Sequence, residues 1–112
     1  MQKSDFYTNI FDVVRQIPKG RATSYGAIAK YLGAARSSRV VGWAMNQSHT
    51  LENKIPAHRV VNRLGMLSGK MHFSTPNIMQ ERLELEGVEI KDDKIQNWKT
   101  IFWDPNLEID FD

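Results

Sequence analysis

Apolar residues recur at helical spacing along the first half of the chain. Within residues 4–17 they form one stripe, which consists of Phe6, Ile10, Val14 and Ile17. This spacing predicts an amphipathic helix that is capped by Ser4. A second, shorter helix is predicted over residues 27–32, with Thr23 or Ser24 as its N-cap.

A third helix is predicted from Ser37 or Ser38 to Ser48. Two short helices joined by a tight turn that contains glycine are typical of a helix-turn-helix element. The third helix carries Gly42 and Ala44, and small residues allow a helix to approach the floor of a groove closely. The same pattern also fits an ordinary helical hairpin packed in a core.

Shorter elements are predicted in the second half of the chain. The apolar run Ile55–Asn62 indicates a buried extended segment followed by a turn. A helix is predicted from Thr75–Pro76 up to Gly87, since proline is favoured at the first helical position. An Asp92–Asp93 turn and an aromatic segment follow, and we expect the acidic residues 104–112 to fray.

The composition indicates one domain without thiol chemistry. With 112 residues, 41% of them hydrophobic, the chain can bury a modest core. We predict one mainly α-helical domain over residues 1–103 and an acidic tail over residues 104–112. The absence of cysteine excludes disulfides, thiolate metal sites and thiol nucleophiles. The three histidines lack metal-ligand spacing, so we expect no metal and no cofactor.

The charge is unevenly distributed along the chain. Residues 15–70 hold ten basic residues and a single acid, Glu52, which gives a net charge of +9. The remaining residues hold five basic and twelve acidic side chains, a net charge of −7. A basic middle is typical of a protein that binds phosphates. A solvated basic face balanced by an acidic tail has the same composition.

The segment Ile55–Val61 reads Ile-Pro-Ala-His-Arg-Val-Val and resembles the active-site motif Pro-Cys-His-Arg-Val of the O6-alkylguanine-DNA alkyltransferases. Residues 17–29 and 39–45 resemble the first helix-turn-helix element and the recognition helix of that family. Residues 82–88 resemble its leucine-rich segment. These motifs occur in the family's order from about Phe6 to Val88. The resemblance implies the family's small, mainly α-helical, winged-helix-like domain.

Ala57 stands where the family has its cysteine. Direct reversal transfers the alkyl group to a thiolate, and an alanine methyl group cannot accept it. We therefore expect no enzyme activity and no catalytic residue. The combination resembles the alkyltransferase-like proteins, in which tryptophan or alanine replaces the cysteine. A cysteine-to-alanine variant of a short O6-alkylguanine-DNA methyltransferase would carry the same residues.

This second resemblance implies a damage sensor for double-stranded DNA. Such a protein binds O6-alkylguanine through the minor groove, everts the base into a pocket and flags it for nucleotide excision repair proteins. We expect a monomer without membrane contact. The predicted location is cytoplasmic, at the nucleoid in a bacterium, or nuclear in a eukaryote.

The resemblance also assigns roles to individual residues. Arg39 matches the arginine that fills the space of the everted base, and Tyr25 matches the tyrosine that crowds the adjacent phosphate. The other expected DNA contacts are Ser38, Gly42 and Lys70. The expected lesion pocket consists of Met45, Pro56, Ala57, His58 and Val60. Arg59 is expected to be structural, and Glu86 matches the acid that partners the histidine.

Three other functions fit parts of the pattern. A helix-turn-helix regulator would bind DNA by sequence and ignore alkylation. A glycosylase or nuclease that activates water with His58 and Glu86 would release a product from alkylated DNA. A protein that masks lesions from a true alkyltransferase would differ only in the consequence of binding.

Overall fold

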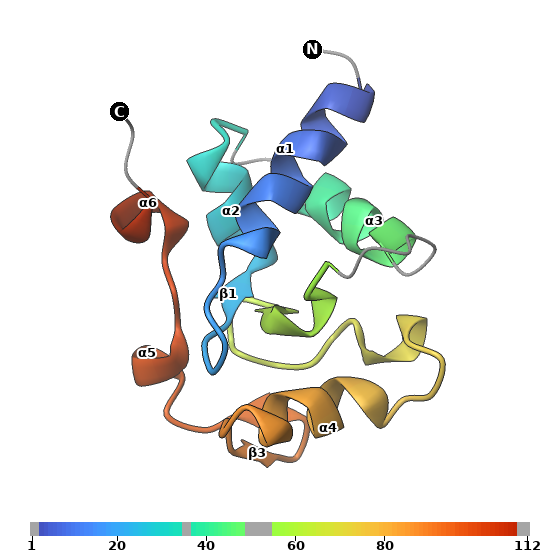
Figure 1. Ribbon diagram of the computed structural model, residues 1–112, viewed down its shortest axis with the longest axis vertical. Coiled ribbons are helices and arrows are strands. Elements are labelled where there is room, and N and C mark those ends of the chain that lie inside the picture. Colours follow the sequence, from blue (N-terminus) through green and yellow to red (C-terminus); the bar gives the residue numbers. More distant parts are fainter. Residues whose placement is uncertain (1–2, 35–36, 49–54, 110–112) are drawn as a thin grey trace.

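The computed structural model describes residues 3–34, 37–48 and 55–109, and it describes side chains from Phe6 onward. The N-terminal helices lie together at one end of the molecule, and α4 with the β3–β4 hairpin lies at the other (Figure 1). The elements, in chain order, are α1 (Lys3–Arg15), β1 (Thr23–Ser24), α2 (Tyr25–Tyr31), α3 (Ser38–Ser48), the 3-10 helix η1 (Ala57–Arg59), β2 (Val60–Val61), the 3-10 helix η2 (Lys70–His72), α4 (Ile78–Leu85), β3 (Ile90–Lys91), β4 (Lys94–Ile95), α5 (Trp98–Ile101) and α6 (Pro105–Glu108). The predicted mainly α-helical domain is confirmed.

The helix α1 buries the predicted apolar stripe. Ile10, Val14 and Ile17 are almost completely buried, and α1 packs on α3. The α-helix ends at Arg15, because the amides of Gln16 and Ile17 bond three residues back and tighten the last turn. The helix already includes Ser4, so the prediction that Ser4 caps it is wrong.

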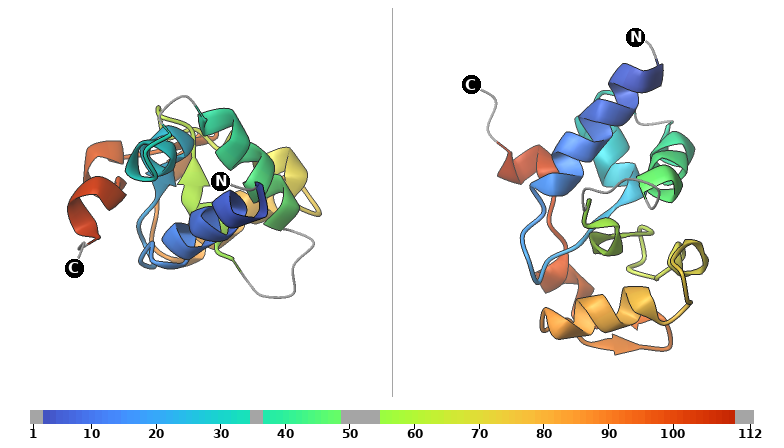
Figure 2. Two further views of the ribbon diagram at one scale, coloured as in Figure 1. Left: turned by 90° about the horizontal axis from the view of Figure 1, so that it is seen from above. Right: turned by 45° about the vertical axis from the view of Figure 1, so that its right-hand side comes forward.

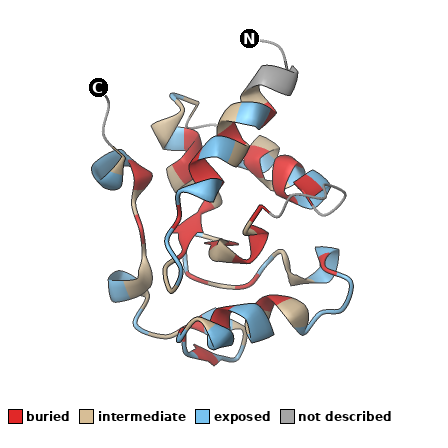
Figure 3. Cartoon of the chain, viewed as in Figure 1, coloured by how far each residue is buried: buried red, intermediate tan, exposed pale blue. Residues whose placement is uncertain are grey.

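The pair α2 and α3 forms the predicted two-helix unit. The side chain of Ser24 accepts a hydrogen bond from the amide of Ala27 at 3.1 Å, which confirms Ser24 as the N-cap of α2. On α3, the face that turns to α1 and α2 is buried and consists of Val41, Ala44, Met45 and Ser48. The facing sides of these three helices form much of the core (Figure 3).

A short parallel sheet joins the motif of residues 55–61 to the start of α2. In it Thr23 pairs with Val60 and Ser24 pairs with Val61. The predicted extended segment is partly wrong, because residues 57–59 form the 3-10 turn η1 and only Val60–Val61 is a strand. The turn directs His58 and Arg59 toward Glu86, at the end of α4.

The helix after Pro76 begins later than expected, whereas its end before Gly87 and the Asp92–Asp93 turn are confirmed. The helix α4 begins at Ile78, two residues beyond Pro76, and ends before Gly87, whose φ is +90°. Asp92 and Asp93 both adopt positive φ in the two-residue turn of the β3–β4 hairpin.

The expectation that the tail frays is wrong for residues 104–109. Asp104 caps α6 through the amide of Asn106, Pro105 is buried, and α6 packs on α2. The helices α3 and α6 lie on opposite sides of α2 in both views of Figure 2. Residues 110–112 lie outside the described residues. None of the helices described is long and apolar enough to cross a bilayer.

Candidate nucleic-acid interface

A cleft of about 420 Å³ opens between the start of α2, the outer face of α3 and the segment 68–72. Its lining combines aromatic, polar and cationic side chains with two glycines. The lining residues are Tyr25, Ser38, Arg39, Gly42, Trp43, Asn46, Ser68, Gly69 and His72. The cleft therefore offers both a positive charge and flat rings to a bound partner.

A second, inner pocket adjoins this cleft and is more enclosed than the cleft. It holds only about 10 Å³ of free space. Its walls are mostly apolar and consist of Tyr25, Met45, Asn46, Ala57, Val60, Gly69, Phe73 and Met79. Tyr25, Asn46 and Gly69 line both spaces, so these three residues form the boundary between the cleft and the pocket.

Tyr25 closely approaches the chain on the far side of this boundary. A Cβ atom at Gly69 would lie 2.8 Å from the Tyr25 Oη, so only glycine fits at position 69 without a shift. Burial raises the pKa of the Tyr25 phenol, and a hydrogen bond with the Ser68 side chain opposes that rise. The phenol is therefore neutral at pH 7 and retains a proton that it can donate.

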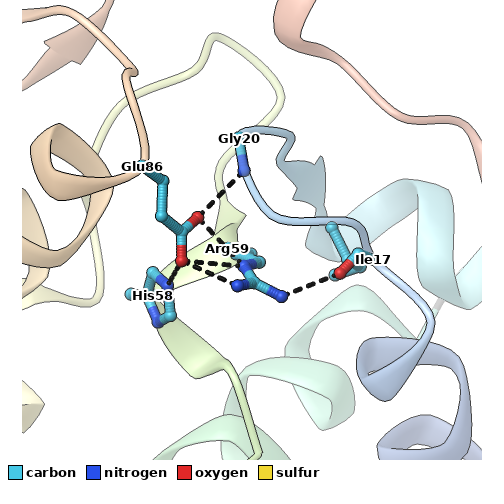
Figure 4. A network of polar contacts seen from close by, with 5 residues as sticks. All are labelled: Ile17, Gly20, His58, Arg59 and Glu86. Atoms are coloured by element: carbon cyan, nitrogen blue, oxygen red, sulfur yellow. Dashed lines mark hydrogen bonds and ion pairs between the residues drawn. The ribbon is translucent and has the colours of Figure 1, made fainter.

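A polar network joins three separate parts of the chain (Figure 4). His58 Nε2 and Arg59 Nη2 both lie 2.7 Å from Glu86 Oε2. The amide of Gly20 donates to Glu86 Oε1 at 3.1 Å, and Arg59 Nη1 donates to the carbonyl oxygen of Ile17 at 2.9 Å. The network fastens η1 to α4 and to the loop that follows α1.

The charges of this network are fixed by its own contacts. Burial raises the pKa of Glu86, but the hydrogen bonds from Arg59, His58 and Gly20 outweigh burial and bring it down to about 2. Burial lowers the pKa of His58, whereas the hydrogen bond with the Glu86 carboxylate and its negative charge raise it less strongly. The imidazole is therefore neutral at pH 7, and its Nε2–H donates to Glu86. Neither His58 nor Glu86 lines the cleft or the inner pocket.

Residues 5–88 match the family described as 6-O-methylguanine DNA methyltransferase, DNA binding domain. The chain belongs to this family. Alkyltransferase-like protein 1 of Schizosaccharomyces pombe is 38% identical over 99 residues, which cover 88% of this chain and 91% of that protein. A DNA base-flipping protein of Vibrio parahaemolyticus is 37% identical over 87 residues, which cover 78% of this chain and 84% of that protein.

The fold agrees with these relationships. The crystal structure of S. pombe Atl1 in complex with damaged DNA containing O6-carboxymethylguanine matches with a TM-score of 0.83 and 38% identity, over 94% of this chain and 100% of that chain. Because this chain contains no cysteine, it is an alkyltransferase-like member of the family. It has no thiol on which to accept an alkyl group.

Four of the five residues expected to contact DNA lie together in the cleft, namely Tyr25, Ser38, Arg39 and Gly42. Lys70 is not among them, because its ammonium group pairs with Asp93 at the hairpin turn. Of the expected pocket residues, Met45, Ala57 and Val60 line the inner pocket. Pro56 and His58 do not line it. The pairing of Glu86 with His58 is confirmed, and Glu86 also pairs with Arg59. The proposed DNA contacts remain predictions.

Several residues of the site were missed by sequence reasoning. Trp43 and Asn46 lie four and seven residues after Arg39, so the helical period of α3 could have placed them on the same face. His72 and Phe73 come from the irregular segment between β2 and α4, where no periodic signal exists. Met79 is buried in the core, and it also forms a wall of the inner pocket.

Proposed function

We propose that this protein binds O6-alkylguanine in double-stranded DNA and marks the lesion without repairing it. One observation carries the proposal. The methyl group of Ala57 lies in the wall of the inner pocket, at the position of the motif where the resembling family has its acceptor cysteine. Once its walls are displaced, the pocket would hold an alkyl group but could not form a bond to it.

The cleft supports entry from the minor groove. Arg39 lies on the exposed face of α3, where its guanidinium group suits the negative potential of that groove. It would occupy the gap that the everted guanine leaves, while Tyr25 stands at the entrance of the inner pocket. Base eversion costs on the order of a few kcal/mol, and least for a base whose pairing is already damaged. O6-alkylation removes the N1 proton of guanine and thereby lowers this cost.

A lesion that is held without chemistry stays in the DNA, so other proteins must remove it. We infer that the bound complex flags the site for nucleotide excision repair. The protein would act where the genome lies, in the nucleoid of a bacterium or the nucleus of a eukaryote.

The test is a titration of two matched duplexes, one with a single O6-methylguanine, followed by mass analysis of the protein. We expect tighter binding to the damaged duplex and an unchanged protein mass. Arg39→Ala should remove the preference and leave a salt-sensitive affinity for both duplexes. Lys30→Ala is the matched control, because Lys30 is exposed on α2 and lies outside the cleft. Equal binding of both duplexes by the wild type, or a protein heavier by one methyl group, would overturn the proposal.

The same titration separates the rival functions. A regulator would follow the sequence of the duplex and ignore the methyl group. A glycosylase or nuclease would release a base or cut a strand. The structure counts against water activation by His58, because that imidazole is buried, bonded to Glu86 and absent from both cavities.

A further inference from the structure

The exposed face of α3 carries a large aromatic side chain next to its glycine. Arg39, Gly42, Trp43 and Asn46 line the cleft, whereas Ala44 is fully buried. The expectation that Ala44 helps to present a flat surface is therefore wrong. The residue that stands beside Gly42 at the cleft is Trp43, and 50% of its surface is exposed.

Packing within the protein explains neither Gly42 nor Trp43. A Cβ atom at Gly42 would meet no described atom within 4 Å, so the fold does not require glycine there. Glycine nevertheless weakens a helix interior relative to alanine. The Trp43 indole is half exposed and lines the cleft, and tryptophan is enriched at interfaces because its ring is apolar and its N–H is polar. Both features suit a partner outside the chain.

We propose that Trp43 is a second, uncharged DNA contact, which wedges into the minor groove beside the everted guanine. The inference rests on the proposed function. Four residues of α-helix advance about 6 Å, and stacked bases are about 3.4 Å apart. The indole would therefore reach the groove within about two base steps of the gap that Arg39 fills.

The neighbouring Gly42 gives this wedge its room. Without a Cβ atom at position 42, the sugars of the groove can approach the backbone of α3 between the two long side chains. Apolar side chains that enter the minor groove partly unstack a base step and kink the duplex. The step next to an everted base is already opened, so the wedge acts on damaged DNA more than on intact DNA.

An uncharged wedge has a signature that a phosphate contact lacks. Trp43→Ala should weaken binding to the lesion duplex about tenfold, the loss typical of one stacked aromatic contact. It should leave both the affinity for undamaged duplex and the salt dependence unchanged, because no counterion is released. Trp43→Phe should keep most of the affinity. Leu85→Ala is the control, since Leu85 is an exposed apolar residue outside both cavities.

The experiment titrates the wild type and these three variants with lesion and undamaged duplexes at several salt concentrations and follows tryptophan emission. Trp103 is buried and the Trp98 Nε1–H donates to the carbonyl oxygen of Arg63, so the lesion-dependent change should come from Trp43 and vanish in Trp43→Ala. Wild-type affinity of Trp43→Ala for the lesion duplex overturns the inference alone. So does an equal loss in Leu85→Ala or on undamaged duplex. If the wild type itself does not prefer the lesion, the proposed function fails as well.

Discussion

Glu86 accepts hydrogen bonds from three residues that belong to two separate parts of the chain. Two of them, His58 and Arg59, follow the pocket residue Ala57 directly, so the network sets the position of the pocket wall. Its remaining partner is the amide of Gly20, which has a positive φ of +84° in the loop after α1. The contacts of His58 and Arg59 with Glu86 thus hold η1 against α4.

Acid should lower the free energy of unfolding over two pH ranges that this network determines. The pKa of His58 is lowered by burial, so the unfolded imidazole takes up a proton first, and stability begins to fall below about pH 6.5. The pKa of Glu86 is depressed from 4.5 to about 2, so its contribution is complete above pH 4.5 and is lost as the pH falls through about 2. A shift of this size corresponds to about 3 kcal/mol of stability.

Urea unfolding between pH 7 and pH 2 measures this dependence. Glu86→Gln should be less stable at pH 7 and should show a flatter profile at acid pH. Glu84→Gln is the matched control, because Glu84 lies on the exposed face of α4. The assignment would be wrong if Glu86→Gln retained the wild-type profile below pH 4.5.

The small side chain of Ala57 should widen the range of adducts that bind. The inner pocket has almost no free space at rest, so an entering alkyl group must displace its walls. Two of these walls are Met45 and Met79, and methionine repacks easily. We expect benzyl adducts to bind at least as well as methyl adducts, because burial stabilises apolar surface by about 25 cal/mol per Å².

Competition binding with methylated and benzylated duplexes tests this expectation. Ala57→Val should weaken binding of the benzyl adduct about tenfold, a loss of about 1.4 kcal/mol, and should change the methyl adduct much less. Undamaged duplex serves as the control for general DNA binding. A sharp preference of the wild type for methyl would contradict the expectation.

On α3, stability and binding should respond to one substitution with opposite signs. Gly42→Ala adds a methyl group that meets no described atom of the protein. It should stabilise the fold by about 0.5–1 kcal/mol, the usual advantage of alanine over glycine in a helix. The same methyl group should weaken DNA binding, because it fills the space between Arg39 and Trp43 on the exposed face. Thermal unfolding of this variant measures the change in stability, and duplex titration measures the change in affinity. Unchanged affinity would show that α3 does not approach DNA closely at Gly42.

Periodicity predicted the helices well and the connections poorly. The three N-terminal helices were found because their apolar residues repeat at a period that only a helix places on one face. The tail was misjudged because the burial of Pro105 against the domain leaves no local signal in an acidic sequence. The pairing of Lys70 with Asp93 was not predicted for a similar reason, since it joins segments 23 residues apart.

The residues of the site were also predicted unevenly. The motif residues 57–61 were positioned by their resemblance to a family, and the structure places Ala57 and Val60 in one pocket. Phe73 completes that pocket from a loop, where neither a motif nor a period points inward. The inner pocket depends on contacts between distant segments, so its size could not be derived from the sequence.

Across the whole molecule, the basic residues of the central segment fall into two groups. Some are bound to the protein itself, as Arg59 is to Glu86 and Arg21 to the carbonyl oxygens of Ile101 and Phe102. Others are exposed and, among the described residues, have no side-chain hydrogen bond or ion pair; they are Lys19, Lys30, Arg39 and Arg63. Arg36 and Lys54 lie outside the described residues. The net charge of +9 therefore overstates what is available to phosphates.

Arg63 and Arg21 should show this division in a salt titration. Arg63 lies beside Tyr25 and Ser38, in a cleft of about 380 Å³ that shares these two residues with the cleft of α3. Arg63→Gln should weaken binding to lesion and undamaged duplexes equally and reduce the slope of log K against log salt by about 1. Arg21→Gln should leave that slope unchanged and instead lower the free energy of unfolding by about 2 kcal/mol, because two backbone carbonyl groups lose a charged donor. If both variants reduced the slope alike, the charge of the central segment would act as one diffuse field, and the division into bound and available cations would be wrong.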